Sequence, residues 1–337
     1  MRILITGATG FIGRHLVERL ARTDHELSCL VRDAGRAEDL TRFGVSLVRG
    51  DVTDRESVLE AVRPCDWVIN LANLYSMWEP DKRVYTTVNV GGTRNVMECS
   101  LESGVSKVVH VSTAGIYGNP SDRPFTEESE IGPTRFSEYA RTKFLADFIA
   151  WDLHEKRGLP LVVIYPGAVL GPGDTKPTGR YIEDLIRGRM PVTVFKDSVM
   201  TYVHVKDVAE AIVRAAEKED NVGEKYLVGK HRLSFAELNE MISEVSGAPL
   251  PKVNLPDKVT ALTAALLTRL SEITKRPPPW GMSADQAGMA EAGFEFDGRK
   301  AEKDLGISYT PIRVAIQETV ESKPRSDREL GDEETCR

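Results

Sequence analysis

The chain has 337 residues, of which 41% are hydrophobic and 28% charged, and its formal net charge is −7. This is the composition of a soluble globular protein, and a negative chain without long basic runs argues against nucleic acid as a partner. We expect no signal peptide and no membrane span, since no apolar run reaches the required length. The widely separated cysteines predict neither a metal site nor a disulfide framework and favour a cytoplasmic location; they are Cys29, Cys65, Cys99 and Cys336.

The first half of the chain alternates short apolar runs with amphipathic segments. This alternation predicts parallel βαβ units, and hence an α/β fold with a doubly wound parallel Rossmann sheet. We expect residues 1–170 to form a nucleotide-binding domain, to which residues 192–215 return. The predicted strands are 3–6, 26–31, 45–48, 67–71, 107–111 and 161–165, and the predicted helices are 11–22, 84–103 and 137–156.

The second half is less regular and predicts a smaller mixed cap, residues 171–321, that binds the substrate. The polar, charge-rich residues 322–337 are expected to form a disordered tail. The apolar stretch 259–270 is too short to span a membrane; a core helix or an interface is favoured, and peripheral lipid contact is the alternative. Helices are predicted at 179–187, 205–218, 234–246, 256–274 and 310–321.

A glycine-rich turn, Gly-Ala-Thr-Gly-Phe-Ile-Gly, joins the first strand to the first helix. Glycines at such a turn let the backbone approach a pyrophosphate, and the helix offers it free N–H groups and a positive dipole end. This turn therefore predicts a dinucleotide site, whose fourth strand would contribute Leu71 and Ala72 to the far side of the cleft. The candidate contacts in the turn are Gly7, Thr9, Gly10, Phe11, Ile12 and Gly13.

The residue after the second strand bears on cofactor choice. An acidic side chain at this position would bind the adenosine ribose of NAD, whereas a cation favours the 2′-phosphate of NADP. Arg32 stands here, with Arg36 nearby, and favours NADP over NAD. Asp33 leaves NAD open, because a shift of one residue would place its carboxylate at the ribose.

Tyr139 and Lys143 are four residues apart in a predicted helix and therefore share one face. A lysine ammonium beside a phenol, with a nicotinamide cation, would lower the phenol's pKa and make it a general acid or base at a carbonyl or carbinol. A hydroxyl at the end of the preceding strand, in the run Val-Ser-Thr-Ala-Gly-Ile-Tyr-Gly from Val111, would orient the substrate oxygen. Tyr75 and Trp78, after the fourth strand, are candidates for the substrate pocket, although packing under the cap explains them equally well.

These motifs, in this order, resemble the extended short-chain dehydrogenases/reductases of the NAD-dependent epimerase/dehydratase kind. The resemblance implies a catalytic triad of Thr113, Tyr139 and Lys143, and a homodimer formed by the two long helices. It also implies adenine contacts at Asp51 and Val52. The segments that carry it are the glycine turn, Asp51-Val52, Asn89-Val-Gly-Gly-Thr93, Ser112–Gly118, Tyr139 with Lys143, the cofactor candidates Tyr165 and Pro166 before Gly167, and Tyr202-Val-His-Val-Lys-Asp207.

Several positions depart from the sugar-modifying members of that family. Ala114-Gly115 replaces the acid pair of the dehydratases, Tyr165-Pro166 replaces an Asn-Pro, and Met200-Thr201 stands where an arginine holds the diphosphate. The chain is more similar to the dihydroflavonol reductase-like branch, and within it to hopanoid-associated sugar epimerase-type proteins. We therefore expect an NAD(P)-dependent oxidoreductase that interconverts a secondary alcohol and a carbonyl. A sugar epimerase is the alternative, and a cofactor-sensing module without catalysis is a third hypothesis.

Overall fold

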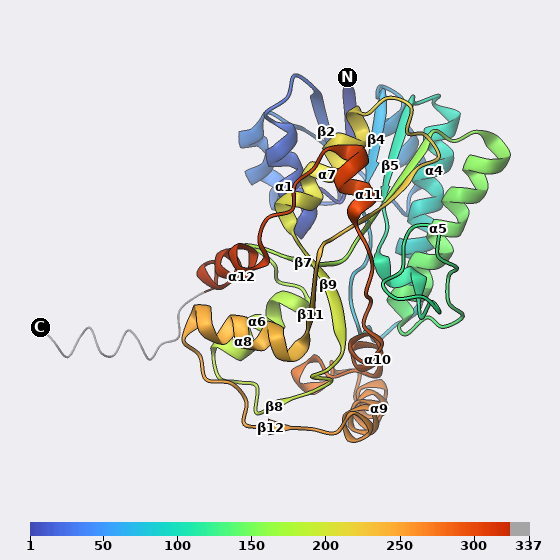
Figure 1. Ribbon diagram of the computed structural model, residues 1–337. Helices are drawn as coiled ribbons and strands as arrows, with labels where there is room; N and C mark the ends of the chain where they lie inside the picture. The colour runs from blue at the N-terminus through green and yellow to red at the C-terminus, as the bar shows by residue number, and fades with distance from the viewer. Residues whose placement is uncertain (324–337) are drawn as a thin grey trace, which may run out of the picture.

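The computed structural model describes residues 1–323, and its main sheet has seven parallel strands in the order β10-β6-β5-β4-β1-β2-β3 (Figure 1). The strand order reverses between β1 and β4, and open α/β sheets bind ligands in the crevice at such a switch point. This confirms the predicted Rossmann sheet. The strands are Arg2–Thr6 (β1), Glu26–Val31 (β2), Ser46–Arg49 (β3), Trp67–Asn70 (β4), Lys107–Val111 (β5), Leu161–Pro166 (β6) and Lys225–Val228 (β10).

Helices cover both faces of the sheet because successive strand side chains point to opposite sides. Ile3 and Ile5 of β1 pack with α1 and α7, while Leu4 packs with α2, α4 and α5 on the other face. The strands are apolar almost throughout, as burial on both faces requires. The helices are Phe11–Leu20 (α1), Val205–Glu217 (α7), Arg55–Val62 (α2), Thr93–Glu102 (α4) and Glu138–Arg157 (α5).

The cap contains a second sheet of three strands, in the order β11-β9-β7. Its apolar cluster is separate from the two clusters of the main sheet and joins this small sheet to α6, α8 and α12. A further helix pair, α9 and α10, lies at the end of the cap most distant from the N-terminus (Figure 1). These elements are His231–Ser234 (β11), Val199–His204 (β9), Ala168–Leu170 (β7), Pro177–Ile186 (α6), Phe235–Ser246 (α8), Ile312–Glu321 (α12), Asp257–Thr274 (α9) and Ala284–Ala292 (α10).

The chain returns to the main sheet from the second half of the sequence. Helix α7 packs against α1, β10 pairs with β6, and α11 (Arg299–Leu305) packs against both late elements. Of the expected tail, only Ser322 and Lys323 belong to the described residues, and the Lys323 ammonium lies 3.9 Å from the Glu183 carboxylate. Residues 324–337 lie outside the described part of the chain. Within residues 1–323, no helix is both long and apolar enough to cross a membrane.

Candidate active site

The glycine turn lies at the carboxyl end of β1, where the strand passes into α1. Gly7 has a φ of +72°, in the left-handed region, and a Cβ placed on it would lie 2.7 Å from the Ala72 backbone nitrogen. A Cβ on Gly13 would lie 2.3 Å from the Gly7 carbonyl oxygen. Both positions therefore require glycine, one for backbone conformation and close approach, the other for helix-to-turn packing alone.

The first turn of α1 fits the pyrophosphate of a dinucleotide. Its N-cap is Gly10, which has no side chain to accept hydrogen bonds from the first-turn N–H groups. Those N–H groups have no intrahelical partner, and the helix dipole places partial positive charge at the same point. The first-turn N–H groups are therefore free to donate to an anion, because the N-cap residue has no side chain that competes for them.

The ends of β2 and β3 carry the polar residues predicted to select and bind the adenosine. Arg32 is exposed just beyond β2. Asp33 is engaged in its own turn: its carboxylate accepts the Gly35 N–H at 3.0 Å and lies 3.5 Å from the Arg36 guanidinium. Asp51 accepts hydrogen bonds from both the backbone N–H and the hydroxyl of Thr53, each at 2.9 Å.

A buried polar chain, which the sequence did not predict, joins the ends of three strands beneath the glycine turn. The Thr6 hydroxyl donates to Asn70 Oδ1 at 2.6 Å and accepts the Ala72 N–H at 3.2 Å. The Asn70 amide nitrogen lies 3.1 Å from Nδ1 of His110. Burial, and secondarily the charge of Lys143, lower the pKa of His110 well below its ordinary value. The imidazole is therefore neutral, and this chain holds Leu71 and Ala72 in place beside Gly7.

The register of the sheet would have indicated this chain. Thr6 pairs with Asn70, and Asn70 pairs with His110, so three polar residues occupy equivalent positions in apolar strands. The signal is a polar residue at the end of each of three buried strands. Recognising it requires the strand order, which brings together residues 64 and 40 positions apart.

The three residues of the predicted triad meet at the carboxyl end of β5. Thr113 follows that strand and accepts the Gly115 N–H at 3.2 Å, which caps a short 3₁₀ turn. Helix α5 begins after Ser137, whose side chain caps it, and this places Tyr139 and Lys143 on its buried side. The Lys143 ammonium donates to the Val111 carbonyl at 2.9 Å, and the Thr113 side chain lies near enough to Tyr139 to lower the pKa of its phenol. The structure thus brings the three together.

The electrostatics of the triad oppose ionisation of the phenol. Burial, followed by the neighbouring Tyr75, raises the pKa of Tyr139 above its ordinary value, and the Thr113 side chain only partly offsets this rise. Burial also lowers the pKa of Lys143 to about 8, with Asp147 acting in the opposite direction. Desolvation is thus the largest effect on the Tyr139 pKa in the protein alone, and the lowering expected from Lys143 together with a nicotinamide cation stays a prediction.

A second buried cluster, also missed in the sequence, lies one turn further along α5. The Asp147 carboxylate accepts a hydrogen bond from the Tyr165 hydroxyl at 2.8 Å, and the Trp151 indole N–H donates to that hydroxyl at 3.1 Å. Burial raises the pKa of Asp147 to about 6. The side chain of Tyr165 thus contacts α5, the helix that carries Tyr139 and Lys143. Pro166, the next residue, ends β6.

The loop after β4 brings an aromatic side chain to the triad. The rings of Tyr75 and Tyr139 lie 4.8 Å apart between centroids. Asn89 fixes this loop to α5: its Oδ1 accepts the Leu74 N–H at 2.6 Å, and its Nδ2 donates to the Thr142 hydroxyl at 3.0 Å. Trp78, the other substrate candidate, lines a small cavity together with Thr268 of α9 and Asp285 of α10.

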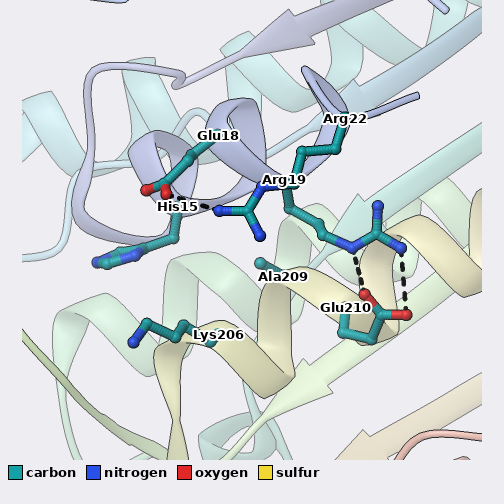
Figure 2. Close-up of a pocket in the computed structure, with 7 residues that line it drawn as sticks. All are labelled: His15, Glu18, Arg19, Arg22, Lys206, Ala209 and Glu210. Carbon is teal, nitrogen blue, oxygen red and sulfur yellow. Dashed lines mark hydrogen bonds and ion pairs between the residues drawn. The ribbon is translucent and has the colours of Figure 1, made fainter. Parts of the chain in front are cut away.

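A larger groove, of about 430 Å³, lies between α1 and α7 and contains none of the predicted site residues (Figure 2). Its charges are paired with one another: Arg19 forms two hydrogen bonds with Glu210, and Arg22 bonds Glu18 at 3.0 Å. His15 at its rim lies 3.0 Å from the Pro172 carbonyl. We interpret this groove as a solvated seam between two helices.

Comparison with known proteins agrees with this geometry. The family model described as "NAD dependent epimerase/dehydratase family" matches residues 3–229. A protein of Synechocystis sp. named putative dihydroflavonol 4-reductase is 27% identical over 94% of this chain and 92% of its own length. Sterol demethylase protein B of Methylococcus capsulatus is 28% identical over 95% and 97% of the two chains. The crystal structure of gox2253 superposes with a TM-score of 0.81 at 29% identity, covering 98% of each chain. The chain therefore belongs to the NAD-dependent epimerase/dehydratase family.

Proposed function

We propose that the protein is an NADP-linked oxidoreductase that interconverts a secondary alcohol and a carbonyl by hydride transfer. The observation that carries the proposal is the meeting of Thr113, Tyr139 and Lys143 at the same sheet edge as the uncapped glycine turn. A general acid or base and a dinucleotide site within one crevice are what hydride exchange at a carbinol carbon requires.

Each residue of the triad has a distinct role in this proposal. Tyr139 gives a proton to the carbonyl oxygen during reduction and takes it back during oxidation. Thr113, whose side chain lies near that phenol, would hold the same oxygen. Lys143 is a buried cation anchored on the Val111 carbonyl, and it favours the phenolate electrostatically. The bound nicotinamide supplies the hydride acceptor or donor.

The dinucleotide would be held along the carboxyl edge of the sheet. We assign the pyrophosphate to the glycine turn and to the start of α1, and the adenosine to Asp51 and Val52. We assign the nicotinamide end of the dinucleotide to residues at the triad. The full set is Gly7, Thr9, Gly10, Phe11, Ile12, Gly13, Arg32, Asp51, Val52, Leu71, Ala72, Tyr139, Lys143, Tyr165 and Pro166, with Tyr75, Thr113 and, more weakly, Trp78 toward the substrate.

The preference for NADP depends on Arg32. Its guanidinium is exposed beyond β2, whereas Asp33 is occupied by Gly35 and Arg36. A charge-assisted hydrogen bond to a 2′-phosphate contributes about 1.5–3 kcal/mol, or about tenfold to a hundredfold in affinity. Arg32→Ala should weaken NADPH binding by that factor in calorimetry and leave NADH binding unchanged. Equal loss for both cofactors would contradict the preference.

The activity can be tested by absorbance at 340 nm, with NADPH and a panel of ketones and aldehydes. Tyr139→Phe should lower turnover by about 10²–10⁴-fold while the protein still binds NADPH, because only the proton-transferring hydroxyl is removed. Tyr226→Phe is the matched control, since it removes a buried hydroxyl on β10. Silence across a broad panel, or full activity of Tyr139→Phe, would refute the proposal.

A sugar epimerase is the second candidate, because Tyr117-Gly118 is typical of epimerases. In this structure the Tyr117 ring stacks on Phe125 at 4.8 Å and its hydroxyl bonds the Glu127 carbonyl at 3.3 Å. These contacts give Tyr117 a packing role and favour the reductase. Cofactor that copurifies with the protein, together with a thermal shift by UDP- or GDP-sugars, would instead support epimerisation.

We extend the proposal to the organisation of the protein. Residues 1–170, with 192–215, would bind cofactor, and residues 171–321 would mainly form the substrate cap. Burial of three unpaired cysteines on separate elements, Cys29, Cys65 and Cys99, supports a cytoplasmic location. A homodimer through the long helices would cover Phe148 of α5, which is 62% exposed; Phe148→Glu should then yield monomers in sedimentation.

A further inference from the structure

Helix α9 lies at the far end of the cap (Figure 1). The exposed fractions of its side chains show that it presents an apolar stripe to solvent. The five members within the helix, from Val259 to Ile273, follow one another at three or four residues and so share one side of it, and Trp280 lies six residues beyond the helix end. Leu262 is 63% exposed, Ile273 is 81% exposed, and Trp280 just beyond the helix is 70% exposed. Isolated exposed apolar residues are ordinary, but a continuous row on one helix indicates an interaction surface. The row is Val259, Leu262, Leu266, Leu270, Ile273 and Trp280.

The body of the protein fixes this stripe outward. On the opposite side of α9, Ala264 packs in an apolar cluster with Ala287 and Ala290 of α10. The Thr268 hydroxyl accepts the Ala284 N–H at 2.7 Å, and Glu272 forms an ion pair with Lys82 at 2.9 Å. Rotation of α9 to bury the stripe would break all of these contacts, so the exposed face is a stable property of the fold.

Exposed basic residues border the stripe. Lys258 precedes Leu262 by four residues and Arg269 precedes Ile273 by four, which places both cations along its edge. Residues 252–280 contain five basic and two acidic residues, a net charge of +3, in a chain whose net charge is −7. The apolar surface thus coincides with a local reversal of the protein's charge. The basic residues are Lys252, Lys258, Arg269, Lys275 and Arg276.

We propose that α9 docks the protein on the surface of an anionic lipid bilayer. The leucine stripe would enter the boundary between headgroups and acyl chains, with Trp280 at headgroup depth and the lysines and arginines on the lipid phosphates. This is the pattern of an interfacial amphipathic helix: one apolar face, a basic border and an aromatic residue at the edge. The helix would lie parallel to the membrane plane and would not cross it.

A second copy of the chain is the rival occupant, and the charge distribution disfavours it. A two-fold interface brings the same patch of each subunit face to face. Two segments of charge +3 would then face each other across the interface and repel. An anionic surface would attract the same basic residues. The apolar stripe alone suits either partner, whereas its basic border suits the lipid.

Docking would also place the substrate loop close to the membrane. Trp78 and Tyr85 line the same small cavity as Thr268 of α9, and the Ser283 hydroxyl before α10 donates to the Met77 carbonyl at 2.7 Å. The α9–α10 pair therefore supports the loop that carries Tyr75 to the triad. The docking itself does not depend on the proposed reaction, and binding can be measured without any substrate.

Vesicle flotation of the full chain tests the proposal. We expect binding to phosphatidylcholine vesicles that contain phosphatidylglycerol and much weaker binding without it. Leu266→Glu with Leu270→Glu should reduce binding by at least about a hundredfold, because each change removes an apolar side chain that the bilayer would bury. Lys258→Gln with Lys275→Gln should reduce binding by about fivefold per removed cation. Val314→Glu, an exposed apolar residue on α12, is the matched control and should bind as the wild type does.

Two further measurements keep the outcomes separate. Circular dichroism and NADPH binding must be unchanged in the Leu266/Leu270 variant, which excludes misfolding. Sedimentation must give the same oligomeric state for wild type and variant. Wild-type protein that ignores anionic vesicles would overturn the proposal, as would a Leu266/Leu270 variant that still floats. A change of oligomeric state in that variant would assign the stripe to a second copy instead.

Discussion

Replacement of Gly7 by alanine isolates the physical reason for the glycine turn. Two costs arise at this position: an L-residue at a φ of +72°, and a Cβ 2.7 Å from the Ala72 nitrogen and 2.8 Å from the Leu71 carbonyl carbon. The first costs about 1–2 kcal/mol. The second requires the backbone after β4 to move by several tenths of an ångström, and overpacking of this kind costs about 1–3 kcal/mol. We therefore expect Gly7→Ala to lower the free energy of unfolding by about 2–5 kcal/mol.

Gly44 provides the matched control. Its φ is +74°, and its Cβ would meet nothing within 4 Å. Gly44→Ala therefore incurs the conformational cost alone, about 1–2 kcal/mol. Urea denaturation of both variants gives the two free energies, and their difference is the cost of the contact with the β4 loop.

Cofactor binding should separate the two variants more sharply than stability does. The backbone that Gly7→Ala displaces is one wall of the proposed dinucleotide site, whereas Gly44 lies after a surface 3₁₀ helix. The thermal shift produced by NADPH should disappear in Gly7→Ala and persist in Gly44→Ala. Equal unfolding free energies, or an unchanged shift in Gly7→Ala, would refute the close-approach argument.

Three further substitutions test the buried polar groups. Asp147→Asn should remove a pH dependence of stability: the native carboxyl, with a pKa near 6 against an ordinary 3.8, binds more protons than the unfolded one. Wild-type stability should therefore fall by about 2–3 kcal/mol as pH rises through that window, and the variant should show no such slope in urea titrations. Asn70→Leu should cost about 2–5 kcal/mol by thermal or urea unfolding, since Thr6 and His110 lose their partner, whereas Asn95→Leu, a half-buried control, should cost less. Tyr75→Ala should move the limb of the alcohol-oxidation pH profile that reports Tyr139 to lower pH, because it removes a ring 4.8 Å away that helps to bury the phenol; an unmoved limb would contradict the assignment.

Six of the seven strands of the main sheet could be predicted because their signals are local, whereas β10, which comes after the first half of the chain, was not predicted. The strand expected at 107–111 is β5 without a change of boundary, and Ser137 was predicted to open the helix that it caps. Apolar runs between turns and a hydroxyl before a helix act over a few residues, so neighbouring sequence contains the information. The long helix 84–103 was also found, but not its π-helical segment, Thr86–Gly92, from which Asn89 reaches the Leu74 loop and Thr142.

In the cap, most of the helices could be predicted from the sequence but the strands could not. Its predicted helices include 234–246, and the structure shows that this one, α8, begins with a capping box of Ser234 and Glu237. Its strands were missed because each is short and gains its partners from distant chain: β9 pairs with β7 and β11, and Met200 also bridges to Phe294. For α9, periodicity predicted a helix, but it could not decide which side would be buried against α10.

The protonation state of Tyr139 should depend on whether the cofactor is bound. Burial above all, and then Tyr75, favours the neutral form of Tyr139, and Thr113 offsets only part of this. Burial likewise lowers the pKa of Lys143 to about 8, so the lysine begins to lose its proton just above neutral pH. A positive charge added beside the phenol would stabilise the phenolate most in such a low-dielectric environment, since the same burial that opposes ionisation also strengthens Coulomb attraction. The free protein is therefore expected to keep Tyr139 protonated, and ultraviolet difference titration should show phenolate formation at lower pH with NADP⁺ than without it. A titration that is identical with and without NADP⁺, in protein shown to bind it, would separate Tyr139 from the cofactor and remove the basis of the proposed chemistry.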